Sequence, residues 1–475
     1  MNFLKKIDFS LCVVTGLTLL YALLYSTNNT LDSIAYSLDI RSGKDLFYPH
    51  HLLFNAFGFV LSKLFNINNT LVFICFVNAL FAGGCLLTIR RILLHFTDNK
   101  TCAIALLFLG SCYGFMRFAT DAEAYIIPLF FALLGSKIIF SGRKFILTSF
   151  LLSIACLFHQ IFFFWWVGLC VYILWNFEEQ RLKNVVKYIS TAFIVPVVYF
   201  LVFRLTENDC NNVLEYIFHD YIKNPNVSIS LNSTIFLLTP VSFIRTFIQV
   251  HGYILPLLQK YSLIILPVAI ACICFVIGLF KIKGSITKTD FSLQTNKYAL
   301  SHLLIFVLQL LFAAISDGNA EFMLMLPFLS AIFFFGKYSI KFSPILYFAI
   351  GIFLWNISLA LIPTHFLKTG IDEPMVKYIQ QHPDKSYFLS ENKRIGFLLE
   401  YESPDKKYNI YYTKAELDSL VKSGNTVLTH AVNNTFFMSR GSILSNNADL
   451  FSNYNINIID SINYSLGTVY ISSVE

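Results

Sequence analysis

Two carboxylates and two imidazoles stand close together in the sequence between the first two apolar blocks. Asp32 and Asp39 fall on one face of a predicted helix that ends at Gly43. At a rise of about 1.5 Å per residue, these carboxylates lie on one side of the helix, roughly 10 Å apart. His50 and His51 follow a few residues later. Because a carboxylate can accept the proton of a hydroxyl group, this segment could supply a general base.

The apolar residues of the same helix allow a plainer interpretation. Leu31, Ile34 and Leu38 line another face, as in a helix that lies along a membrane surface with its polar side in water. The sequence Tyr48-Pro-His-His, which leads into a second predicted apolar helix over 52–65, favours a functional role instead. Both interpretations remain open from the periodicity alone.

A second group of ionisable residues falls at a predicted turn between two apolar blocks. Arg117, Asp121 and Glu123 occupy the sequence Arg-Phe-Ala-Thr-Asp-Ala-Glu. Ionisable side chains at membrane depth are costly and are therefore candidates for function. The alternatives are an ion pair between Arg117 and one of the acids that holds the turn, and a helix cap at Asp121.

Three more polar residues interrupt apolar sequence and are candidates for substrate binding. His159 falls at a predicted turn, where a hydrogen-bonded packing role is the alternative. Arg245 could bind a lipid phosphate with two parallel hydrogen bonds, or could extend to the headgroups. Glu321 follows a tight turn, Asp317-Gly-Asn-Ala, and could line a cavity.

The composition shows what must position these residues. Of the 475 residues, 56% are hydrophobic and 13% are charged, whereas soluble chains have about 25% charged residues. Too few polar side chains remain to cover a soluble globule. The net charge of +7 comes from short basic clusters between apolar blocks, which argues against a nucleic-acid-binding surface. The sequence therefore predicts an all-α polytopic membrane protein.

The apolar blocks have lengths near that needed to cross a bilayer of about 30 Å. We expect about eleven transmembrane helices, at approximately 8–25, 70–90, 101–118, 123–140, 145–159, 161–176, 188–205, 262–281, 297–315, 320–336 and 342–363. Lys and Arg are concentrated in the segments that would be cytoplasmic if the N-terminus, with Lys5 and Lys6, is inside. An odd number of spans then places the C-terminal end outside.

Residues 1–366 form the predicted transmembrane domain, and residues 367–475 a small α/β extracytoplasmic domain. Short apolar runs that begin at Ser386, Asn409, Thr426 and Thr468 predict strands, and residues 414–424 predict a helix. Two outer segments, 26–69 and 207–261, are too long to be simple connections, and long loops are often functional.

The cysteines indicate neither a disulfide framework nor a zinc motif. Nearly all ten lie in apolar blocks, where a thiol behaves as a small hydrophobic group, and none follows Cys274. No Walker-type glycine loop, serine-nucleophile motif or HExxH pattern is present. We predict no cofactor; paired carboxylates could hold a divalent metal ion, but no spacing requires one.

The sequence Asp32-Ser-Ile-Ala-Tyr, followed by Ile40-Arg-Ser-Gly-Lys-Asp-Leu-Phe-Tyr-Pro-His-His, resembles the first outer loop of the GT-C fold glycosyltransferases, which include protein O-mannosyltransferases and lipid A aminoarabinose transferases. The motif-level resemblance covers about residues 30–55 and, more loosely, 117–130. The family's loop usually begins with Asp-Glu, whereas Ser33 follows Asp32 here.

The resemblance implies an enzyme that moves a sugar from a polyprenyl-phosphate-linked donor to an acceptor hydroxyl. The acceptor would be a glycan, a lipid or a protein. Asp32 would be the general base by its match to the family's loop acid, with Asp39 in reserve. Glu123 would correspond to the acid at the start of the fourth span. His50 and His51 could orient substrate or contact phosphate, or could simply form a polar boundary at a helix start.

Two other classes fit a polytopic chain with long outer loops. A surface-polysaccharide polymerase or ligase would depend more on loop arginines, and a transporter or lipid flippase would place acids and broken helices near mid-membrane. The acids of this chain cluster at one membrane face instead, which favours an enzyme. We expect a bacterial inner membrane, although an endoplasmic reticulum protein would have a similar composition, and partners that include membrane lipids but no nucleic acid.

Overall fold

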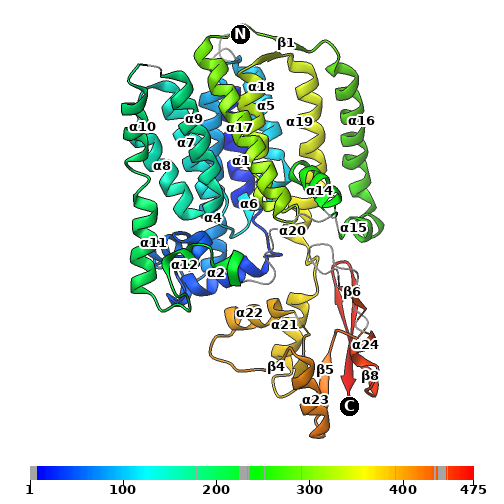
Figure 1. Ribbon diagram of the computed structural model, residues 1–475. Coiled ribbons are helices and arrows are strands. Elements are labelled where there is room, and N and C mark those ends of the chain that lie inside the picture. Colours follow the sequence, from blue (N-terminus) through cyan, green and yellow to red (C-terminus); the bar gives the residue numbers. More distant parts are fainter. Residues whose placement is uncertain are drawn as a thin grey trace. The chain divides into compact units, whose positions relative to one another are not determined.

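The computed structural model is mostly helical, with 68% of residues in helices (Figure 1). It describes residues 8–177, 179–223, 233, 235–250, 252–289, 291–390, 392–432, 435–436, 445–446 and 448–475. Lys5 and Lys6 lie outside these ranges. The chain divides into two units. The helical unit contains Met1–Tyr25, Asp39–Val250 and Ile264–Leu361, and the α/β unit contains Ser26–Leu38, His251–Leu263 and Ile362–Glu475.

The helical unit is a bundle of helices that run side by side (Figure 1). Its elements are α1 (Phe9–Leu23), η2 (Pro49–His51), α3 (Phe54–Leu64), α4 (Thr70–Leu93), α5 (Asn99–Ser111), α6 (Tyr113–Thr120), α7 (Ile126–Ser141), α8 (Phe145–Phe158), η3 (Gln160–Phe162), α9 (Phe163–Asn176), α10 (Arg181–Ile189), α11 (Ile194–Leu205), α12 (Val213–Ile217), α13 (His219–Lys223), α14 (Ile235–Phe247), α16 (Ile265–Ile282), β1 (Ile286–Lys288), α17 (Leu293–Ile315), η5 (Glu321–Met323), α18 (Leu326–Phe335), β2 (Tyr338–Ile340), α19 (Phe342–Asn356) and η6 (Ile357–Leu361).

The length and hydropathy of the helices identify an integral membrane protein. Among the described residues, five helices are long and apolar enough to cross a membrane, or six if the bent pair α5 and α6 is one span. Seven further apolar helices are shorter than 18 residues. An apolar helix lies at each of the eleven predicted positions, but the count of eleven spans is not confirmed and stays a prediction.

The helices pack closely where one of them presents a glycine. A Cβ atom on Gly168 of α9 would lie 2.1 Å from Cγ1 of Ile305 on α17, and one on Gly83 of α4 would lie 2.4 Å from the hydroxyl of Thr18 on α1. Small residues let helix backbones approach in a membrane, where lipid tails are as apolar as the side chains. These contacts hold the bundle in one arrangement.

The first outer helix, α2 (Leu31–Ser42), begins and ends within one residue of the prediction. Gly43 follows it in the left-handed conformation, at φ 74°, which suits glycine at a helix end. The boundary between the two units falls inside this helix, so Asp32 belongs to the α/β unit and Asp39 to the helical unit. The predicted helix over 52–65 is α3, two residues shorter at its start.

The α/β unit contains most of α2, all of α15 (Ile254–Lys260) and most of η4 (Ser262–Ile264), together with the residues from Ile362 onward. Its further elements are α20 (Ile362–Phe366), α21 (Asp372–Gln381), β3 (Ser386–Phe388), α22 (Lys393–Glu402), β4 (Asn409–Tyr411), α23 (Lys414–Lys422), β5 (Val427–Thr429), β6 (Thr435–Phe436), β7 (Ser445–Asn446), α24 (Ala448–Phe451), β8 (Ile456–Tyr464) and β9 (Gly467–Val474).

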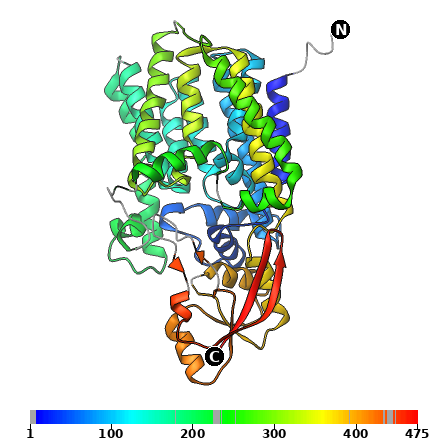
Figure 2. The same cartoon turned by 90° about the vertical axis from the view of Figure 1, so that its right-hand side faces the viewer.

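Five strands form one sheet in the order β4-β3-β5-β9-β8. The strands β3, β4 and β5 are parallel, while β9 pairs antiparallel with both β5 and β8. The hairpin of β8 and β9 is the longest part of the sheet (Figure 2), and its register skips Ile459. The four predicted strands and the predicted helix α23 are present, whereas β8 was not predicted.

A histidine is buried at the end of β5. His430 is only 2% exposed, and neither ring nitrogen has a hydrogen-bond partner among the described residues. Burial lowers the pKa of His430 to about 4, and the nearby Asp372 carboxylate acts in the opposite direction. The imidazole is therefore neutral at pH 7.

Candidate functional site

The predicted histidines meet at one end of the helical unit. His51 in η2 and His159, which precedes η3, have ring centroids 4.3 Å apart, and the rings of His50 and His51 are 4.0 Å apart. His51 and His159 are 5% and 3% exposed. Burial lowers the pKa of His51 well below its usual range, and the neighbouring His50 and His159 act in the same direction. His51 is therefore neutral at pH 7.

Gln160 fixes the turn that carries these imidazoles. Its side-chain amide nitrogen donates to the carbonyl oxygens of Pro49, at 3.1 Å, and Ile217, at 2.7 Å. The same nitrogen lies 3.0 Å from the hydroxyl of Tyr199, which donates to the Pro49 carbonyl oxygen. One side chain thus joins η2, η3 and α12, which are far apart in the sequence.

Tyr125 connects the imidazoles to a carboxylate. Its ring centroid lies 4.8 Å from that of His159 and 4.7 Å from that of Phe118. Its hydroxyl donates to Oε2 of Glu321, at 2.8 Å. The tyrosine is only 5% exposed, so its hydroxyl needs this acceptor to be satisfied inside the protein.

Glu321 also faces a guanidinium group. Its Oε1 lies 3.8 Å from Nη2 of Arg117, whose guanidinium carbon is 4.9 Å from the ring centroid of Phe118. The two charged side chains are 25% and 31% exposed, so both reach solvent. Arg245 on α14 lies within electrostatic range of Arg117, Glu321 and Tyr113. The cations Arg117 and Arg245 and the carboxylate of Glu321 therefore interact electrostatically beside the ring of Phe118.

The predicted acids Asp121 and Glu123 lie in the loop between α6 and α7, and each is 3% exposed. Nδ2 of Asn78 donates to the backbone carbonyl oxygens of both residues, at 2.8 Å in each case. Asp121 is the C-cap residue of α6 and does not begin the next helix, which has Tyr125 at its N-cap. Both acids are among the charges that attract Arg117.

The two carboxylates of α2 differ in their surroundings. Asp39 accepts hydrogen bonds from the hydroxyl of Tyr48, at 3.0 Å, and from Nδ2 of Asn55, at 3.4 Å. Asp32 lies in the first turn of the helix and is exposed. Tyr36, which the helical periodicity places on the same face as Asp32 and Asp39, is buried at 6% exposure. The expected acidic face is therefore interrupted.

The structure thus brings most of the predicted site residues of the helical unit into one cluster. We call it the polar cluster and define it as His50, His51, Arg117, Tyr125, His159, Arg245 and Glu321. Asp121 and Glu123 lie in the adjoining loop, and Asp39 is bound to Tyr48 of the first outer segment. Asp32 belongs to the other unit.

Sequence reasoning missed the residues that connect the cluster. Tyr125 lies in the stretch 117–130 that loosely resembles the family, but it is one of 25 tyrosines, so its type gave no signal. Asn78 could have been found, because an amide inside an apolar helix needs hydrogen-bond partners. Gln160 directly follows His159, but no role was predicted for it.

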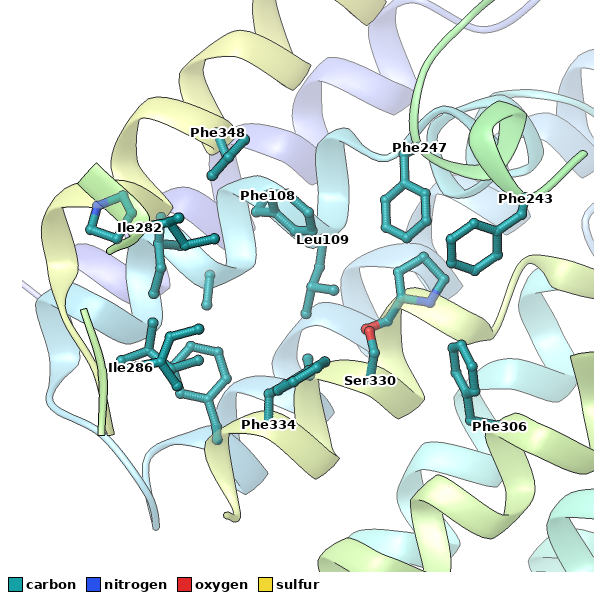
Figure 3. Close-up of a pocket in the computed structure, with 17 residues that line it drawn as sticks. Phe108, Leu109, Phe243, Phe247, Ile282, Ile286, Phe306, Ser330, Phe334 and Phe348 are labelled. Atoms are coloured by element: carbon teal, nitrogen blue, oxygen red, sulfur yellow. The ribbon is translucent and has the colours of Figure 1, made fainter. Parts of the chain in front are cut away.

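An apolar cavity of about 390 Å³ lies in the helical unit (Figure 3). Its lining includes Phe108 of α5, Phe306 of α17 and Phe334 of α18, and α14 contributes Phe243 and Phe247. Arg245 lies between Phe243 and Phe247 in the sequence of the same helix. One helix therefore contributes to both the apolar cavity and the polar cluster.

No protein-family model and no curated protein sequence matches the chain. Among solved structures, it is similar to ArnT from Cupriavidus metallidurans bound to undecaprenyl phosphate, with a TM-score of 0.56, 10% sequence identity and 97% of each chain covered. ArnT, a lipid A aminoarabinose transferase, has the GT-C fold. The present chain has the GT-C fold.

A second similarity is to the oligosaccharyltransferase AglB from Archaeoglobus fulgidus in complex with an inhibitory peptide and a dolichol-phosphate. It has a TM-score of 0.40 and 11% identity, and covers 91% of this chain and 70% of that chain. The similarity to ArnT confirms the GT-C fold predicted from the first outer loop, and it covers 97% of each chain.

Proposed function

We propose that the protein is a membrane glycosyltransferase that transfers a sugar from a polyprenyl-phosphate-linked donor to an acceptor hydroxyl. The observation that carries the proposal is the polar cluster, in which Arg117, Arg245 and Glu321 stand beside buried imidazoles in a GT-C fold. Undecaprenyl phosphate is bound by ArnT, which shares this fold. Transfer to a hydroxyl needs a base for the proton and partners for the leaving phosphate.

The helix α14 offers complementary surfaces for the two parts of such a donor. Phe243 and Phe247 line the apolar cavity, which suits part of a prenyl chain because apolar side chains and isoprenoid groups exclude water together. Arg245 comes from the same helix and lies within electrostatic range of Arg117. We propose that this pair of cations binds the phosphate that the lipid carries.

Glu321 keeps one of these cations in place. Its two oxygens accept the Tyr125 hydroxyl and face Arg117, so the guanidinium group is held near one position. A guanidinium group binds phosphate through two parallel hydrogen bonds only when its plane is oriented. Preorganised cations stabilise the charge that develops on the leaving phosphate as the bond to the sugar breaks.

Asp32 is our proposed general base, and Asp39 has a positioning role. Asp39 already accepts hydrogen bonds from Tyr48 and Asn55, which hold its carboxylate in place. Asp32 is exposed in the first turn of α2. Its carboxylate would accept the proton of the acceptor hydroxyl as the oxygen attacks the sugar carbon.

The test is sugar transfer by purified full-length protein from a labelled polyprenyl-phosphate sugar. Asp32→Asn keeps the size of the side chain and removes the base, so kcat should fall by about 100-fold or more. Asp45→Asn, in the same outer segment, is the matched control and should retain activity. Arg117→Gln should raise KM for the lipid donor by about tenfold or more, since a charged hydrogen bond is lost.

The result that contradicts the base assignment is full transfer by a folded Asp32→Asn variant. If wild-type protein in a lipid bilayer transfers no sugar from any of several polyprenyl-phosphate donors, the proposed donor class is wrong.

A further inference from the structure

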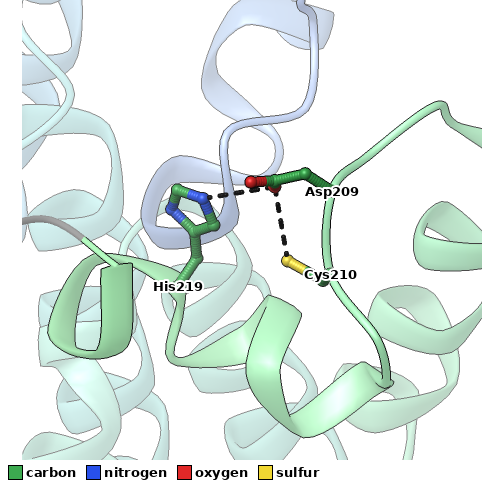
Figure 4. Close-up of side chains that lie close together, drawn as sticks. All are labelled: Asp209, Cys210 and His219. Atoms are coloured by element: carbon green, nitrogen blue, oxygen red, sulfur yellow. Dashed lines mark hydrogen bonds and ion pairs between the residues drawn. The ribbon is translucent and has the colours of Figure 1, made fainter.

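Three side chains of different chemistry converge in the second outer segment. Asp209 and Cys210 follow α11, and His219 begins α13 (Figure 4). Nε2 of His219 lies 3.6 Å from Oδ1 of Asp209, and Sγ of Cys210 lies 3.8 Å from the same oxygen. All three potential ligand atoms lie within 4.8 Å of one another.

Two of these separations are close to the edge lengths of a zinc coordination tetrahedron. Zinc binds oxygen and nitrogen ligands at about 2.0–2.2 Å and sulfur at about 2.3 Å, which places neighbouring tetrahedral ligands roughly 3.3–3.8 Å apart. The two measured separations at Asp209 fall in this interval. A mixture of thiolate, imidazole and carboxylate ligands also suits zinc better than magnesium or calcium, which prefer oxygen ligands.

Cys210 differs from the other cysteines in its surroundings. It stands in the polar sequence Asn208-Asp-Cys-Asn-Asn, whereas the others lie in or between apolar helices. Its thiol is partly exposed, so it can reach a metal ion from solvent. Cys210 also packs against the apolar cluster that contains Leu52 and Tyr216, but its thiol is not enclosed there.

The backbone on both sides of Cys210 is fixed by side chains. Oδ1 of Asn208 accepts the N–H of Cys210, at 3.2 Å, and its Nδ2 donates to the carbonyl oxygens of Phe203 and Thr206, at 3.0 Å each. On the other side, Glu215 accepts the N–H of Asn211, at 2.8 Å. The ligand positions are therefore held before a metal binds, which lowers the entropic cost of binding.

We propose that Asp209, Cys210 and His219 bind one Zn²⁺ ion, with the fourth position open to water. The Cys210 thiol loses its proton to solvent as the zinc–sulfur bond forms, and the neutral imidazole of His219 coordinates through Nε2. The plain alternative is a surface ion pair between His219 and Asp209, which contributes little. Sequence spacing alone gives no zinc motif here, because eight residues, which include the helix α12, lie between the cysteine and the histidine.

A bound zinc ion would restrain α12, which contacts the turns that carry residues of the polar cluster. The hydroxyl of Tyr216, in α12, donates to the carbonyl oxygen of Phe47, at 2.8 Å, and Gln160 donates to that of Ile217. The metal ligands lie on both sides of α12, so a bound ion would restrain this helix on the turn that carries His50 and His51. The site is structural in character and does not depend on the proposed sugar transfer.

The test uses full-length protein in detergent, treated with a chelator, exposed to Zn²⁺ and freed of excess metal. Mass spectrometry of the metal content should give one zinc per wild-type chain. Cys210→Ser and Asp209→Asn should weaken zinc binding by at least tenfold. Cys272→Ser removes an exposed cysteine on α16 and should bind zinc as the wild type does. Co²⁺ should give a thiolate charge-transfer absorption that Cys210→Ser lacks.

Asp209→Asn keeps the test decisive if the cysteine variant folds poorly, because its side chain is 73% exposed and supports little packing. Absence of stoichiometric zinc in the wild type, or equal zinc affinity in Asp209→Asn and wild type, would overturn the proposal. Binding of Cu²⁺ without Zn²⁺ would also overturn it.

Discussion

At the scale of single residues, the protein keeps the buried imidazoles of His51 and His430 neutral and leaves Arg117 partly exposed. His51 is buried beside two further histidines, and burial lowers its pKa. Arg117 and Glu321 are partly exposed and face each other. A phosphate group would therefore be attracted by the guanidinium groups, while the imidazole provides a hydrogen bond without adding charge.

The buried His430 predicts a pH dependence of stability. Its pKa is about 4 in the folded state and about 6.5 in an unfolded chain. The unfolded state binds the extra proton, so the stabilisation is complete above pH 6.5 and is lost as the pH falls through 6.5 toward 4. The loss should approach about 3 kcal/mol, at 1.36 kcal/mol per pKa unit.

Hydrogen exchange of β5 and β9 peptides, corrected for intrinsic rates at each pH, should show this loss. His430→Leu fills the same apolar site without a titrating group and should flatten the dependence between pH 6.5 and 4. His382→Gln changes an exposed histidine and should behave as the wild type. Equal pH dependence in His430→Leu and wild type would contradict the assignment.

The candidate residues could be predicted because ionisable groups are rare in apolar helices. The side chains that contact these residues could not be predicted. Arg117 and Glu321 are separated by most of the membrane sequence, so no local pattern predicts their proximity. Tyr125 carries an aromatic ring in a chain that is 17% aromatic, and only its hydrogen bond to Glu321 distinguishes it.

At the scale of elements, the close packing of α9 on α17 requires a glycine at position 168. Gly168→Ala would place Cβ 2.1 Å from Cγ1 of Ile305, and a β-branched side chain in a helix has few other rotamers. The helices must therefore separate, which should cost about 1–3 kcal/mol of unfolding free energy. Denaturant-induced unfolding in detergent measures this change.

Gly16→Ala is the matched control for this prediction. It also changes a helical glycine, but nothing lies within 4 Å of the added Cβ, so stability should be equal or slightly higher because alanine favours the helix. A Gly168→Ala variant as stable as Gly16→Ala would show that the two helices do not pack as described.

Helix positions could be predicted well from apolar runs and capping residues, as α2 shows. Breaks could not. The predicted span over 101–118 is bent by 68° between α5 and α6, although Cys112 at the break is apolar and no proline marks it. Gly110 and Ser111 directly precede the break, and a Gly-Ser pair is a usual site of a kink, but the apolar run alone predicted one straight span.

At the scale of the whole molecule, the charge distribution predicts how the chain is oriented in the membrane. Lys44 lies in a predicted outer segment and Lys100 in a predicted cytoplasmic one, and both are exposed. Cysteine introduced at residue 44 should react with a membrane-impermeant maleimide in intact cells. Cysteine at residue 100 should react only after the membrane is opened.

The background for this labelling replaces Cys12, Cys170, Cys210 and Cys272 with serine, since these thiols are at least partly exposed. Labelling of residue 100 in intact cells, with residue 44 protected, would reverse the proposed orientation. It would also place the polar cluster and the proposed zinc ligands on the cytoplasmic side.

The irregular register of the β8–β9 hairpin has a consequence for solubility. Strand β8 is the outermost strand of its sheet, and Ile458 and Ile459 on it are 61% and 51% exposed. A straight, hydrophobic edge strand of this kind could pair with a strand of another molecule and begin a fibril. Because the register skips Ile459, the edge strand is bent there. The charged Asp460 beside the bend further opposes pairing with a second chain.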